Sequence, residues 1–416
     1  MTILFSTFGS LGDLHPYLAI ALEAKARGHR PIIATAPKYQ IKIEALGLEF
    51  RAVRPDLPPD SEFESLAKRV MNLKDGPRYL FQEIINPNLR DSSADLLTAS
   101  EDADVIITHP AVISGPLVAQ KLGKKWLSSA LAPISLWSKL DAPTPPTVPQ
   151  LDFLRVLGPI WPTIMFTLGK IGTKTWVSEV EKLRAEIGVS SLGHPMFEGQ
   201  FSPFGMLALF SPLFAPPQRD WPTKTTATGF CFYDAGGMGK KSEVDWRAWI
   251  EKGEAPLVFT LGSSAVHDAG DFWRESARVV KNLGTRAIFL TAGTWQSDSE
   301  AILALDYAPH SEIFPLARLV VHQGGAGTTA QALRAGIPQI VTPYAHDQPD
   351  NARRLRKLGV ALSILQGQFQ GKAADAMVSR ALKLDAARAR EIGEKIRREN
   401  GPHAACEVIE QLGTTS

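Results

Sequence analysis

One stretch of the chain, His322-Gln-Gly-Gly-Ala-Gly-Thr-Thr329, combines residue types that could bind a phosphate. The apolar run Leu319–Val321 before it predicts a buried strand that places His322 at its carboxyl end. Three glycines within four positions let backbone N–H groups approach an anion. Thr328 and Thr329 begin a predicted helix, whose first N–H groups lack partners and whose dipole is positive at this end. We therefore predict a phosphate-binding turn between strand and helix.

A polar pair, Asp347 and Gln348, follows the next predicted strand, residues 337–342. The carboxyl ends of neighbouring parallel strands share one edge of a sheet, where ligands of open α/β sheets bind. An acid beside an amide offers the acceptors and donors that sugar hydroxyls need. The glycine turn by itself fits an ordinary strand-to-helix connection, with His322 in the core, about equally well. The pair favours a ligand site.

A carboxylate occupies a comparable place near the amino terminus. Residues Thr2–Thr7 predict the first buried strand, Gly9-Ser-Leu-Gly-Asp13 its turn and Leu14–Arg27 the helix that follows. Asp13 could cap that helix, because Asp is a favoured N-cap residue. It could instead act as a general base, although an ordinary pKa of about 3.9 makes it weak unless burial or a reactive electrophile helps. His15 is the second candidate base.

The elements that position these residues form two similar α/β halves. The strand Leu257–Leu261 and its turn repeat the layout of the first strand and its turn. The glycine-rich segment Asp234-Ala-Gly-Gly-Met-Gly239 predicts the hinge between the halves. The dinucleotide fingerprint G-x-G-x-x-G is absent from the first strand–helix turn, which disfavours a nicotinamide enzyme.

Composition excludes several classes of function. The 416 residues favour two or three domains, and 44% hydrophobic with 21% charged residues are values of a soluble globular protein. A formal net charge of +2 gives no support for nucleic-acid binding. Cys231 and Cys406 make neither a disulfide framework nor a metal cluster, so we expect a reducing, cytoplasmic setting without a leader peptide. His346 and Asp347 lack metal-ligand spacing, and no metal is expected.

The most apolar segment is Phe153–Trp176. Arg155, Lys170 and two prolines interrupt it, and a membrane span needs about 20 clean apolar residues, so we predict no transmembrane helix. A surface that touches a membrane or accepts a hydrophobic substrate stays open.

The segment 322–329 together with Asp347 and Gln348 resembles the signature of family 1 glycosyltransferases, which use nucleotide sugars and have the GT-B fold. The resemblance implies two Rossmann-like domains facing across a cleft. Residues 1–232 would bind the acceptor, residues 233–400 the donor, and a terminal helix at 401–416 would cross back to the first domain. It implies no cofactor and a dTDP- or UDP-sugar as co-substrate.

The same resemblance assigns the donor site. The histidine and the glycine/threonine turn would hold the diphosphate, the acid–glutamine pair the sugar, and the segment at Tyr307 the nucleobase. Ala330 stands where plant enzymes that use UDP carry a glutamate for the ribose, which leaves dTDP open beside UDP. The implied donor-binding residues are Ser263, Tyr307, Ala308, His322, Gly324, Gly325, Gly327, Thr328, Thr329, Asp347, Gln348 and Asn351.

The opening loop, Gly9-Ser-Leu-Gly-Asp-Leu-His-Pro16, resembles that of bacterial and sterol-type members, in which an aspartate is the proposed base. Plant relatives carry histidine there and an acidic partner near the place of His109. This departure leaves a proton relay open, and a core or surface histidine is the favoured interpretation of His109. Each aromatic residue after the proline-rich loop 141–149 fits an ordinary core as well as an acceptor pocket. The candidate acceptor-binding residues are Ser10, His109, Trp137, Trp161 and Phe166.

Three further segments, Leu213–Pro222, Leu257–Ser263 and Ala345–Ala352, are similar to the rhamnosyltransferase subunit of rhamnolipid synthesis and to bacterial flavonoid rhamnosyltransferases. We expect an inverting, metal-independent transfer of rhamnose or glucose to a hydroxyl of a hydrophobic acceptor: a phenolic, a terpenoid or sterol, or a hydroxy-fatty acid. The alternatives are a nucleotide-sugar epimerase of the same fold and a non-catalytic nucleotide-sugar or lipid binder.

Overall fold

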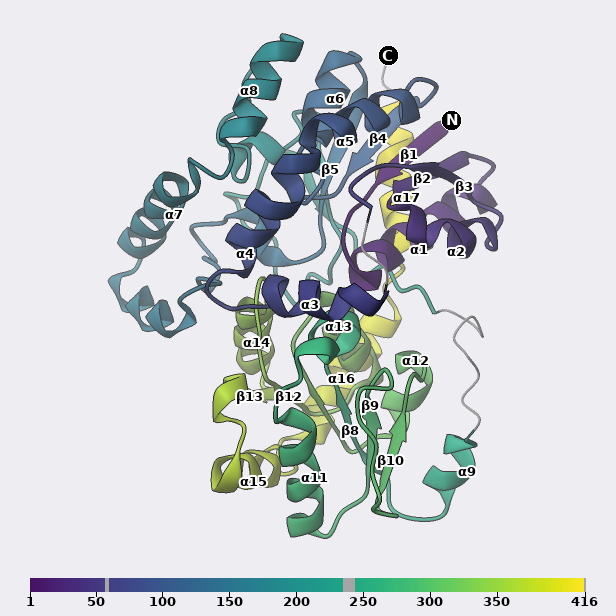
Figure 1. Ribbon diagram of the computed structural model, residues 1–416, viewed down its shortest axis with the longest axis vertical. Coiled ribbons are helices and arrows are strands. Elements are labelled where there is room, and N and C mark those ends of the chain that lie inside the picture. The colour runs from purple at the N-terminus through teal and green to yellow at the C-terminus, as the bar shows by residue number, and fades with distance from the viewer. Residues whose placement is uncertain (57–59, 235–243, 415–416) are drawn as a thin grey trace. The chain divides into compact units, whose positions relative to one another are not determined.

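The computed structural model describes residues 1–56, 60–234 and 244–414. The chain divides into two compact units (Figure 1). Unit 1 comprises residues 1–63, 75–233 and 400–416, and unit 2 comprises residues 64–74 and 234–399. Apart from Asp234, the predicted hinge segment 234–239 lies outside the described residues.

Unit 1 is built on a parallel sheet with the strand order β3-β2-β1-β4-β5-β6-β7. The order reverses between β1 and β4, and ligands of open α/β sheets bind outside the carboxyl ends of the strands at such a reversal. Asp13 follows β1 and His109 follows β4, so the fold brings both to this point. The strands are β1 (Thr2–Ser6), β2 (Arg30–Thr35), β3 (Glu49–Ala52), β4 (Val105–Thr108), β5 (Lys125–Ala130), β6 (Met206–Ala208) and β7 (Thr225–Ala227).

Helices connect these strands, because a parallel strand pair needs a crossover. The last helix, α17, returns to unit 1 and packs on α1, where Cys406 and Ile409 enter the core and Glu410 pairs with Arg27 at 3.1 Å. This confirms the predicted return of the terminal helix. The α-helices are α1 (Leu11–Ala26), α2 (Gln40–Glu44), α3 (Asp60–Val70, shared with unit 2), α4 (Gly76–Tyr79), α5 (Asn86–Ala99), α6 (Gly115–Lys121), α7 (Ile160–Thr173), α8 (Ser178–Ile187) and α17 (Gly401–Thr414). The shorter turns are η1 (Pro37–Tyr39), η2 (a π-helix, Leu80–Ile85), η3 (Pro133–Leu136), η4 (Pro149–Leu157) and η5 (Glu198–Gln200).

Unit 2 repeats the plan with a parallel sheet in the order β10-β9-β8-β11-β12-β13. Its reversal lies between β8 and β11, the strands that precede Ser263 and the 322–329 turn. The strands are β8 (Leu257–Thr260), β9 (Ala287–Leu290), β10 (Ile302–Leu305), β11 (Leu319–His322), β12 (Gln339–Val341) and β13 (Ala361–Ser363). The helices are α9 (Trp246–Glu251), α10 (Gly262–Ala265), α11 (Phe272–Leu283), α12 (His310–Ile313), α13 (Ala326–Ala335), α14 (Gln348–Lys357), α15 (Gly371–Ala381) and α16 (Ala386–Arg397), with the turns η6 (Val266–Asp268), η7 (Phe314–Leu316) and η8 (Gln366–Gln368).

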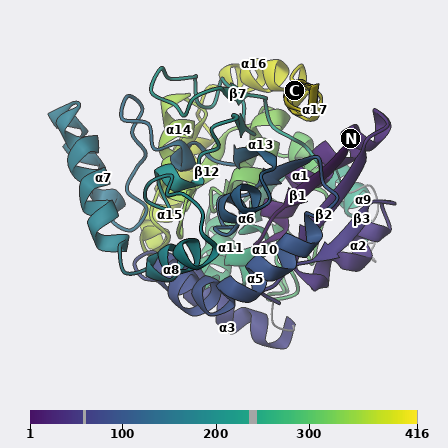
Figure 2. The ribbon, with the colours of Figure 1, turned by 90° about the horizontal axis from the view of Figure 1, so that it is seen from above.

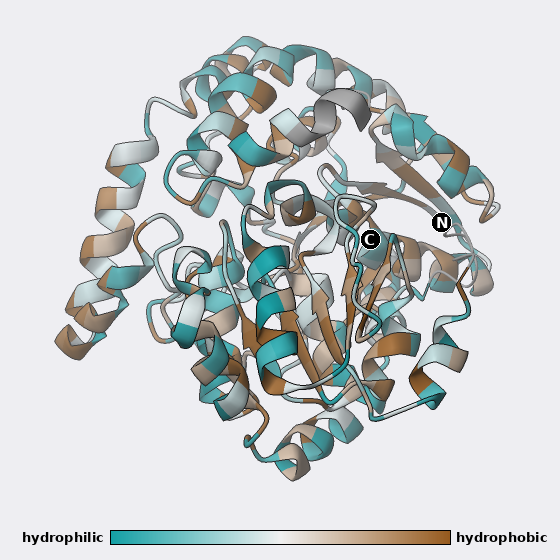
Figure 3. Cartoon of the chain, turned by 60° about the horizontal axis from the view of Figure 1, so that its bottom comes forward, coloured by the Kyte–Doolittle hydropathy of each residue, from teal (hydrophilic) through white to brown (hydrophobic). Residues whose placement is uncertain are grey.

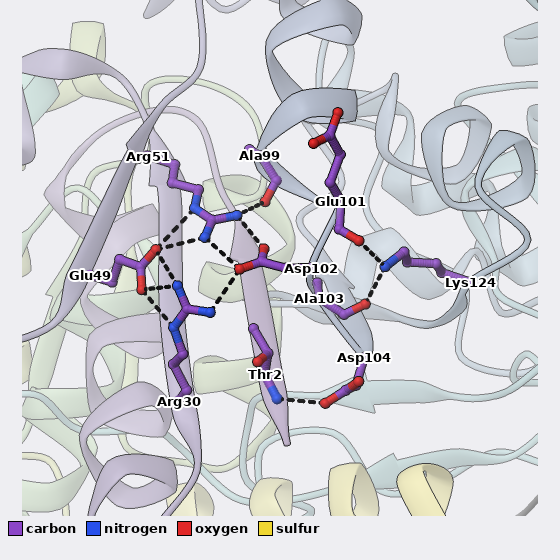
Figure 4. Close-up of polar contacts among 10 residues, drawn as sticks. All are labelled: Thr2, Arg30, Glu49, Arg51, Ala99, Glu101, Asp102, Ala103, Asp104 and Lys124. Carbon is purple, nitrogen blue, oxygen red and sulfur yellow. Dashed lines mark hydrogen bonds and ion pairs between the residues drawn. The ribbon is translucent and has the colours of Figure 1, made fainter.

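An ion-pair network closes the amino-terminal edge of the unit 1 sheet (Figure 4). Arg30 and Arg51 both bridge Glu49 to Asp102, with N–O distances of 2.5 to 2.7 Å. Hydrogen bonds from the Arg51 guanidinium are the main reason why the pKa of Asp102 is lowered. The network joins β2, β3 and the segment before β4, and it lies at the edge opposite to the one that Asp13 and His109 follow.

Helix α13, which begins inside the 322–329 stretch, is packed closely against α16. Gly336 ends α13 with φ +72°, and a Cβ added at Gly393 of α16 would lie 2.7 Å from the Gly336 Cα and 2.9 Å from the Leu333 carbonyl oxygen. Backbone therefore touches backbone where the two helices meet. This contact fixes the position of the helix whose first turn is the candidate phosphate site.

Replacing Gly393 by alanine tests this packing. The added methyl group has only backbone to push against, so we expect a loss of about 1–3 kcal/mol in the free energy of unfolding despite the better helix propensity of alanine. The matched control is Gly172→Ala in α7, where an added Cβ meets no atom within 4 Å and stability should rise by up to about 1 kcal/mol. Urea unfolding of both variants measures the difference; an equal rise in both would contradict the close contact.

Candidate active site

The turn after β1 holds the Asp13 carboxylate in one orientation. Oδ2 accepts hydrogen bonds from the Ser10 N–H at 2.7 Å and the Ser10 hydroxyl at 3.0 Å. Gly9 has φ +130°, and a Cβ there would lie 2.4 Å from the same oxygen. Ser10, not Asp13, is the N-cap of α1, and Asp13 is the third helical residue that completes a capping box. The interpretation of Asp13 as the N-cap was therefore wrong, and the helix begins three residues earlier than predicted.

The other oxygen of Asp13, Oδ1, lies 3.4 Å from Nε2 of His109. His109 is buried, and its Nδ1 accepts a hydrogen bond from the Ala111 N–H at 3.0 Å. A neutral imidazole that accepts at Nδ1 carries its proton on Nε2, which therefore points that N–H at Asp13. The sequence interpretation of His109 as an ordinary core or surface histidine missed this pairing.

Two opposing effects set the pKa of Asp13. Burial raises it, but the hydrogen bond and charge of His109 and the hydrogen bonds from Ser10 outweigh burial, so the pKa of Asp13 is lowered from its ordinary value. The carboxylate is ionised at neutral pH, and its side chain remains 34% exposed. Asp13 is thus an accessible base of low intrinsic strength, which suits proton removal from an alcohol that is already attacking an electrophile.

His15, the second candidate base, has a different environment. Its Nε2 lies 2.8 Å from the Lys42 ammonium, which donates to it, and its ring lies 5.0 Å from that of Tyr233. An imidazole nitrogen that accepts from a cation gains little by binding a second proton. The geometry therefore favours Asp13 over His15 as the base.

Two tyrosines that the sequence analysis did not select support this turn. Tyr39 donates its hydroxyl to the Gly9 carbonyl at 2.9 Å. Tyr17 bonds the Ser129 hydroxyl at 2.6 Å, and its ring meets the His109 ring edge-on with centroids 6.0 Å apart. Both sit among apolar residues with ordinary core spacing, so the sequence carried no sign of these contacts.

In unit 2, the imidazole of His322 is enclosed at the end of β11. Its Nδ1 accepts from the Gly324 N–H at 3.1 Å, and its Nε2 donates to Oε1 of Gln339 at 2.9 Å. Burial lowers the pKa of His322 to about 4, so the ring is neutral at pH 7. Both ring nitrogens are hydrogen-bonded to protein groups, so His322 holds the glycine turn in its shape. The sequence analysis did not select Gln339, the partner of His322, although it is a polar residue at the start of an apolar strand.

Glycine is required at two positions near this turn, because neighbouring atoms lie too close to leave room for a side chain. Gly324 has φ +92°, and a Cβ there would lie 2.6 Å from Cγ1 of Val341 in β12. Gly262, in the turn after β8, has φ +66°, and its Cβ would lie 2.3 Å from Nε2 of Gln323. The Gln323 side chain, which belongs to the turn after β11, therefore lies against the turn after β8, in which Ser263 is exposed.

Helix α13 starts without a cap. Gly325 is the N-cap and has no side chain to bond the first N–H groups, and the first turn contains no acidic residue. Gly327 is exposed and a Cβ there would meet no atom within 4 Å, whereas Thr328 and Thr329 are buried. Uncapped N–H donors at the positive end of a ten-residue helix form a site suited to an anion.

Asp347, Gln348 and Asn351 connect the next loop to this turn. The Asn351 amide donates to the Gly324 carbonyl at 2.8 Å and to Oδ2 of Asp347 at 2.6 Å. Gln348 uses its Oε1 to accept from the N–H groups of Tyr344 and Ala345, at 2.8 and 3.2 Å. The structure thus brings these three residues to the glycine turn, with Asp347 partly exposed.

The candidate nucleobase segment lies after β10, at the far edge of the unit 2 sheet. The Tyr307 side chain is 42% exposed and Ala308 is buried. Beyond them His310 stacks on Phe314 with centroids 4.4 Å apart, and burial lowers the pKa of His310 to about 4. Although β10 is the edge strand, the chain after it turns back towards the helix that follows the glycine turn: α12 contacts α13, and Ala308 shares an apolar cluster with Val320 and Ala332.

The aromatic candidates for acceptor binding lie in two places: Trp137 and Phe166 pack against each other, and Trp161 lines a cavity elsewhere in unit 1. Trp137, with φ 50°, donates its Nε1–H to the Met196 carbonyl at 3.0 Å and packs against Phe166 and Phe197. Trp161 instead lines a separate surface cavity of unit 1.

Among the described residues no helix is long and apolar enough to cross a membrane, and no group of three or more His, Cys, Asp or Glu side chains could hold a metal ion.

Comparison with known sequences points to sugar transfer. A family described as erythromycin biosynthesis protein CIII-like, C-terminal domain, matches residues 297–413. The chain is 29% identical to the O-mycaminosyltylonolide 6-deoxyallosyltransferase of Streptomyces fradiae over 428 residues, which cover 100% of this chain and 98% of that relative. It is 27% identical over 438 residues to a sterol 3-beta-glucosyltransferase of Leptosphaeria maculans, covering 98% of this chain but 28% of that longer protein.

Solved glycosyltransferases share the fold. The calicheamicin glycosyltransferase CalG4 superposes with a TM-score of 0.69 at 17% identity, covering 99% of this chain and 97% of that one. The spinosyn rhamnosyltransferase SpnG, solved with thymidine diphosphate, superposes with a TM-score of 0.67 at 18% identity, covering 99% and 100%. The fold is GT-B, which confirms the predicted fold class. The special likeness to rhamnolipid and flavonoid rhamnosyltransferases stays a prediction.

The pairing of Asp13 with His109 predicts the behaviour of His109 variants. In His109→Phe the Nε2–H donor is lost while burial persists, so the pKa of Asp13 should rise from its lowered value. In His109→Gln the amide can still accept from Ala111 and donate to Asp13, and the pKa should stay near that of the unmodified protein. Carboxyl carbon NMR titration of Asp13 makes the measurement. The same Asp13 pKa in both variants would show that the pair does not exist.

Proposed function

We propose that this protein is a glycosyltransferase that moves a hexose from a nucleoside diphosphate sugar to a hydroxyl of a hydrophobic small molecule. The observation that carries the proposal is the uncapped start of α13, with its glycine turn held open by His322, Gln323 and Asn351. Full-length similarity to a deoxysugar transferase and the shared GT-B fold support the same conclusion. Unit 2 then binds the donor and unit 1 the acceptor.

The donor diphosphate binds the first N–H groups of α13, from Ala326 to Thr328, where the helix dipole adds attraction for negative charge. The sugar lies against Asp347 and Gln348, and the base stacks on the exposed ring of Tyr307. Two features favour dTDP over UDP: Ala330 supplies no carboxylate for a ribose, and the similar spinosyn transferase was solved with thymidine diphosphate. Rhamnose and glucose are both kept as donor sugars.

The reaction is a single inverting displacement. Asp13 takes the proton of the acceptor hydroxyl as its oxygen attacks the anomeric carbon, and the nucleoside diphosphate leaves with the bonding electron pair. His109 holds the Asp13 carboxylate through its Nε2–H, while the α13 N–H groups stabilise the charge that grows on the leaving diphosphate. Positioning of the two substrates supplies much of the remaining acceleration. No step of this scheme uses a metal.

Substitution of Asp13 separates a catalytic from a structural role. Asp13→Asn keeps an oxygen that can accept from Ser10 but cannot take a proton, and Asp13→Ala removes both. If Asp13 is the base, both variants should lose about 10²–10⁴ in turnover. Turnover is measured with UDP-glucose, dTDP-glucose and dTDP-rhamnose against a panel of hydrophobic alcohols and phenols. Near-full turnover of Asp13→Asn would exclude the base assignment, and new sugar formed without acceptor would indicate an epimerase.

Substitution of Gly327 tests the phosphate site with opposite effects on stability and binding. In Gly327→Asp the added Cβ meets no atom within 4 Å and the carboxylate lies at the positive end of α13, so stability should rise by about 0.3–1 kcal/mol. The same charge repels a diphosphate, and the affinity for dTDP and UDP should fall by at least about tenfold. Gly327→Ala is the neutral control. Calorimetry that finds equal nucleotide affinity in the Asp and Ala variants would place the diphosphate elsewhere.

A further inference from the structure

A short segment from the amino-terminal half of the chain, residues 64–74, belongs to unit 2. Helix α3 (Figures 1 and 2) leads into it. The Met71 N–H donates to the Ala67 carbonyl at 2.8 Å, so these two buried residues lie one helical turn apart. Met71 belongs to the main apolar cluster of unit 2, whose strands are hydrophobic (Figure 3). The core of unit 2 therefore includes a side chain from this segment.

The segment is hydrogen-bonded to the loop that follows β12. Nε2 of His346 lies 3.0 Å from the Val70 carbonyl oxygen, which can only accept, so the imidazole donates. The two residues before His346 belong to the same apolar cluster as Met71. Asp347, the proposed ligand of the donor sugar, comes directly after His346. The segment thus contacts unit 2 one residue away from the proposed sugar site.

The backbone of His346 is in an unusual conformation. Its φ of +57° lies in the left-handed region, which residues with a Cβ rarely adopt. Such a conformation persists only where the surrounding contacts impose it. Gln348 and Asn351 bond the residues on either side of His346 within the loop, and the His346 ring adds a bond to the neighbouring segment. The direction in which the chain enters Asp347 therefore depends on this contact.

The same segment also lies near the turn that follows β8. Burial raises the pKa of Asp268 in η6, and the charge of Lys68 in the segment opposes that rise, so the two side chains are neighbours. In the sheet order, β8 and β12 stand on either side of β11. Residues 64–74 thus reach the loops that flank the candidate phosphate turn on both sides.

We propose that His346 is a positioning residue: supported by segment 64–74, it holds Asp347 in the orientation that binds the donor sugar. The inference rests on the proposed function for the role of Asp347. The nucleotide itself binds at α13 and Tyr307 under that function. His346 should therefore govern the affinity for the sugar portion of the donor and leave the affinity for the free nucleotide unchanged.

Two variants with side chains of equal length separate the hydrogen bond from packing. His346→Gln and His346→Met both carry an unbranched side chain, but only the Gln amide can donate to the Val70 carbonyl. Calorimetry compares dTDP with whichever of dTDP-glucose and dTDP-rhamnose the unmodified protein binds more tightly. His346→Met should bind that dTDP-sugar about tenfold more weakly, because fewer molecules hold Asp347 in place, and should keep its dTDP affinity. His346→Gln should keep both affinities.

A substitution in the segment tests whether the support comes from there. Met71→Ala loosens the segment without changing the loop, and it should also weaken dTDP-sugar binding. The double variant His346→Met/Met71→Ala should lose no more than the greater single loss, because both changes act through one contact. The control is Val279→Ala in α11, which shortens another buried side chain of the same apolar cluster. It should leave the ratio of dTDP-sugar to dTDP affinity unchanged.

Equal dTDP-sugar affinities of the Gln and Met variants would overturn the proposal, as would additive losses in the double variant. A parallel loss of dTDP and dTDP-sugar affinity in His346→Met would also overturn it, in favour of a purely structural role. Amide NMR without ligand gives a test that does not need the proposed function: the Asp347 resonance should move in Met71→Ala and stay fixed in Val279→Ala. If the unmodified protein binds none of the dTDP ligands, the proposed function fails, while an unmoved Asp347 resonance in Met71→Ala shows that the positioning fails.

Discussion

A helix cannot pair its own first N–H groups, and the N-cap of α13, Gly325, has no side chain that could do so. The residues around it fix the shape of the glycine turn. His322 fixes the glycine turn through Gly324, Gln323 joins it to the turn after β8, and Asn351 links it to the loop that carries Asp347. At the other end, Gly393 lets α16 hold α13 in place. Under the proposed function, these open N–H donors bind the diphosphate.

Unit 1 has the same kind of parallel sheet, but a carboxylate and a histidine lie where its strand order reverses. The strand order reverses between β1 and β4, and the residues that follow these strands, Asp13 and His109, meet there. Their pairing inverts the order described above for the plant relatives, since here the acid follows the first strand and the histidine follows β4. The hydrogen bonds that orient Asp13 also lower its pKa, so under the proposed function Asp13 is a well-oriented base of reduced strength.

Local patterns in the sequence were sufficient for the strand–turn–helix at 319–329 and for two α/β halves, whereas the return of the terminal helix to unit 1 was implied by the resemblance to the GT-B family. They failed where a contact depends on strand order. His109 and Asp13 belong to distant segments, and only the placement of β4 beside β1 brings them together. Ser10 displaced Asp13 as the cap because a serine one turn earlier forms the full capping box. Gln339 and Tyr17 look like ordinary strand and core residues until their partners are known.

The central claim is that a nucleoside diphosphate binds the open start of α13. Amide NMR of the protein during titration with dTDP tests it most directly, because each N–H group reports its own environment. The account predicts that the resonances of Ala326, Gly327 and Thr328 shift strongly and together with dTDP concentration, while the amides of Arg30 and Arg51 at the opposite edge of unit 1 stay fixed. Saturable dTDP binding that leaves the three α13 amides unmoved would contradict it.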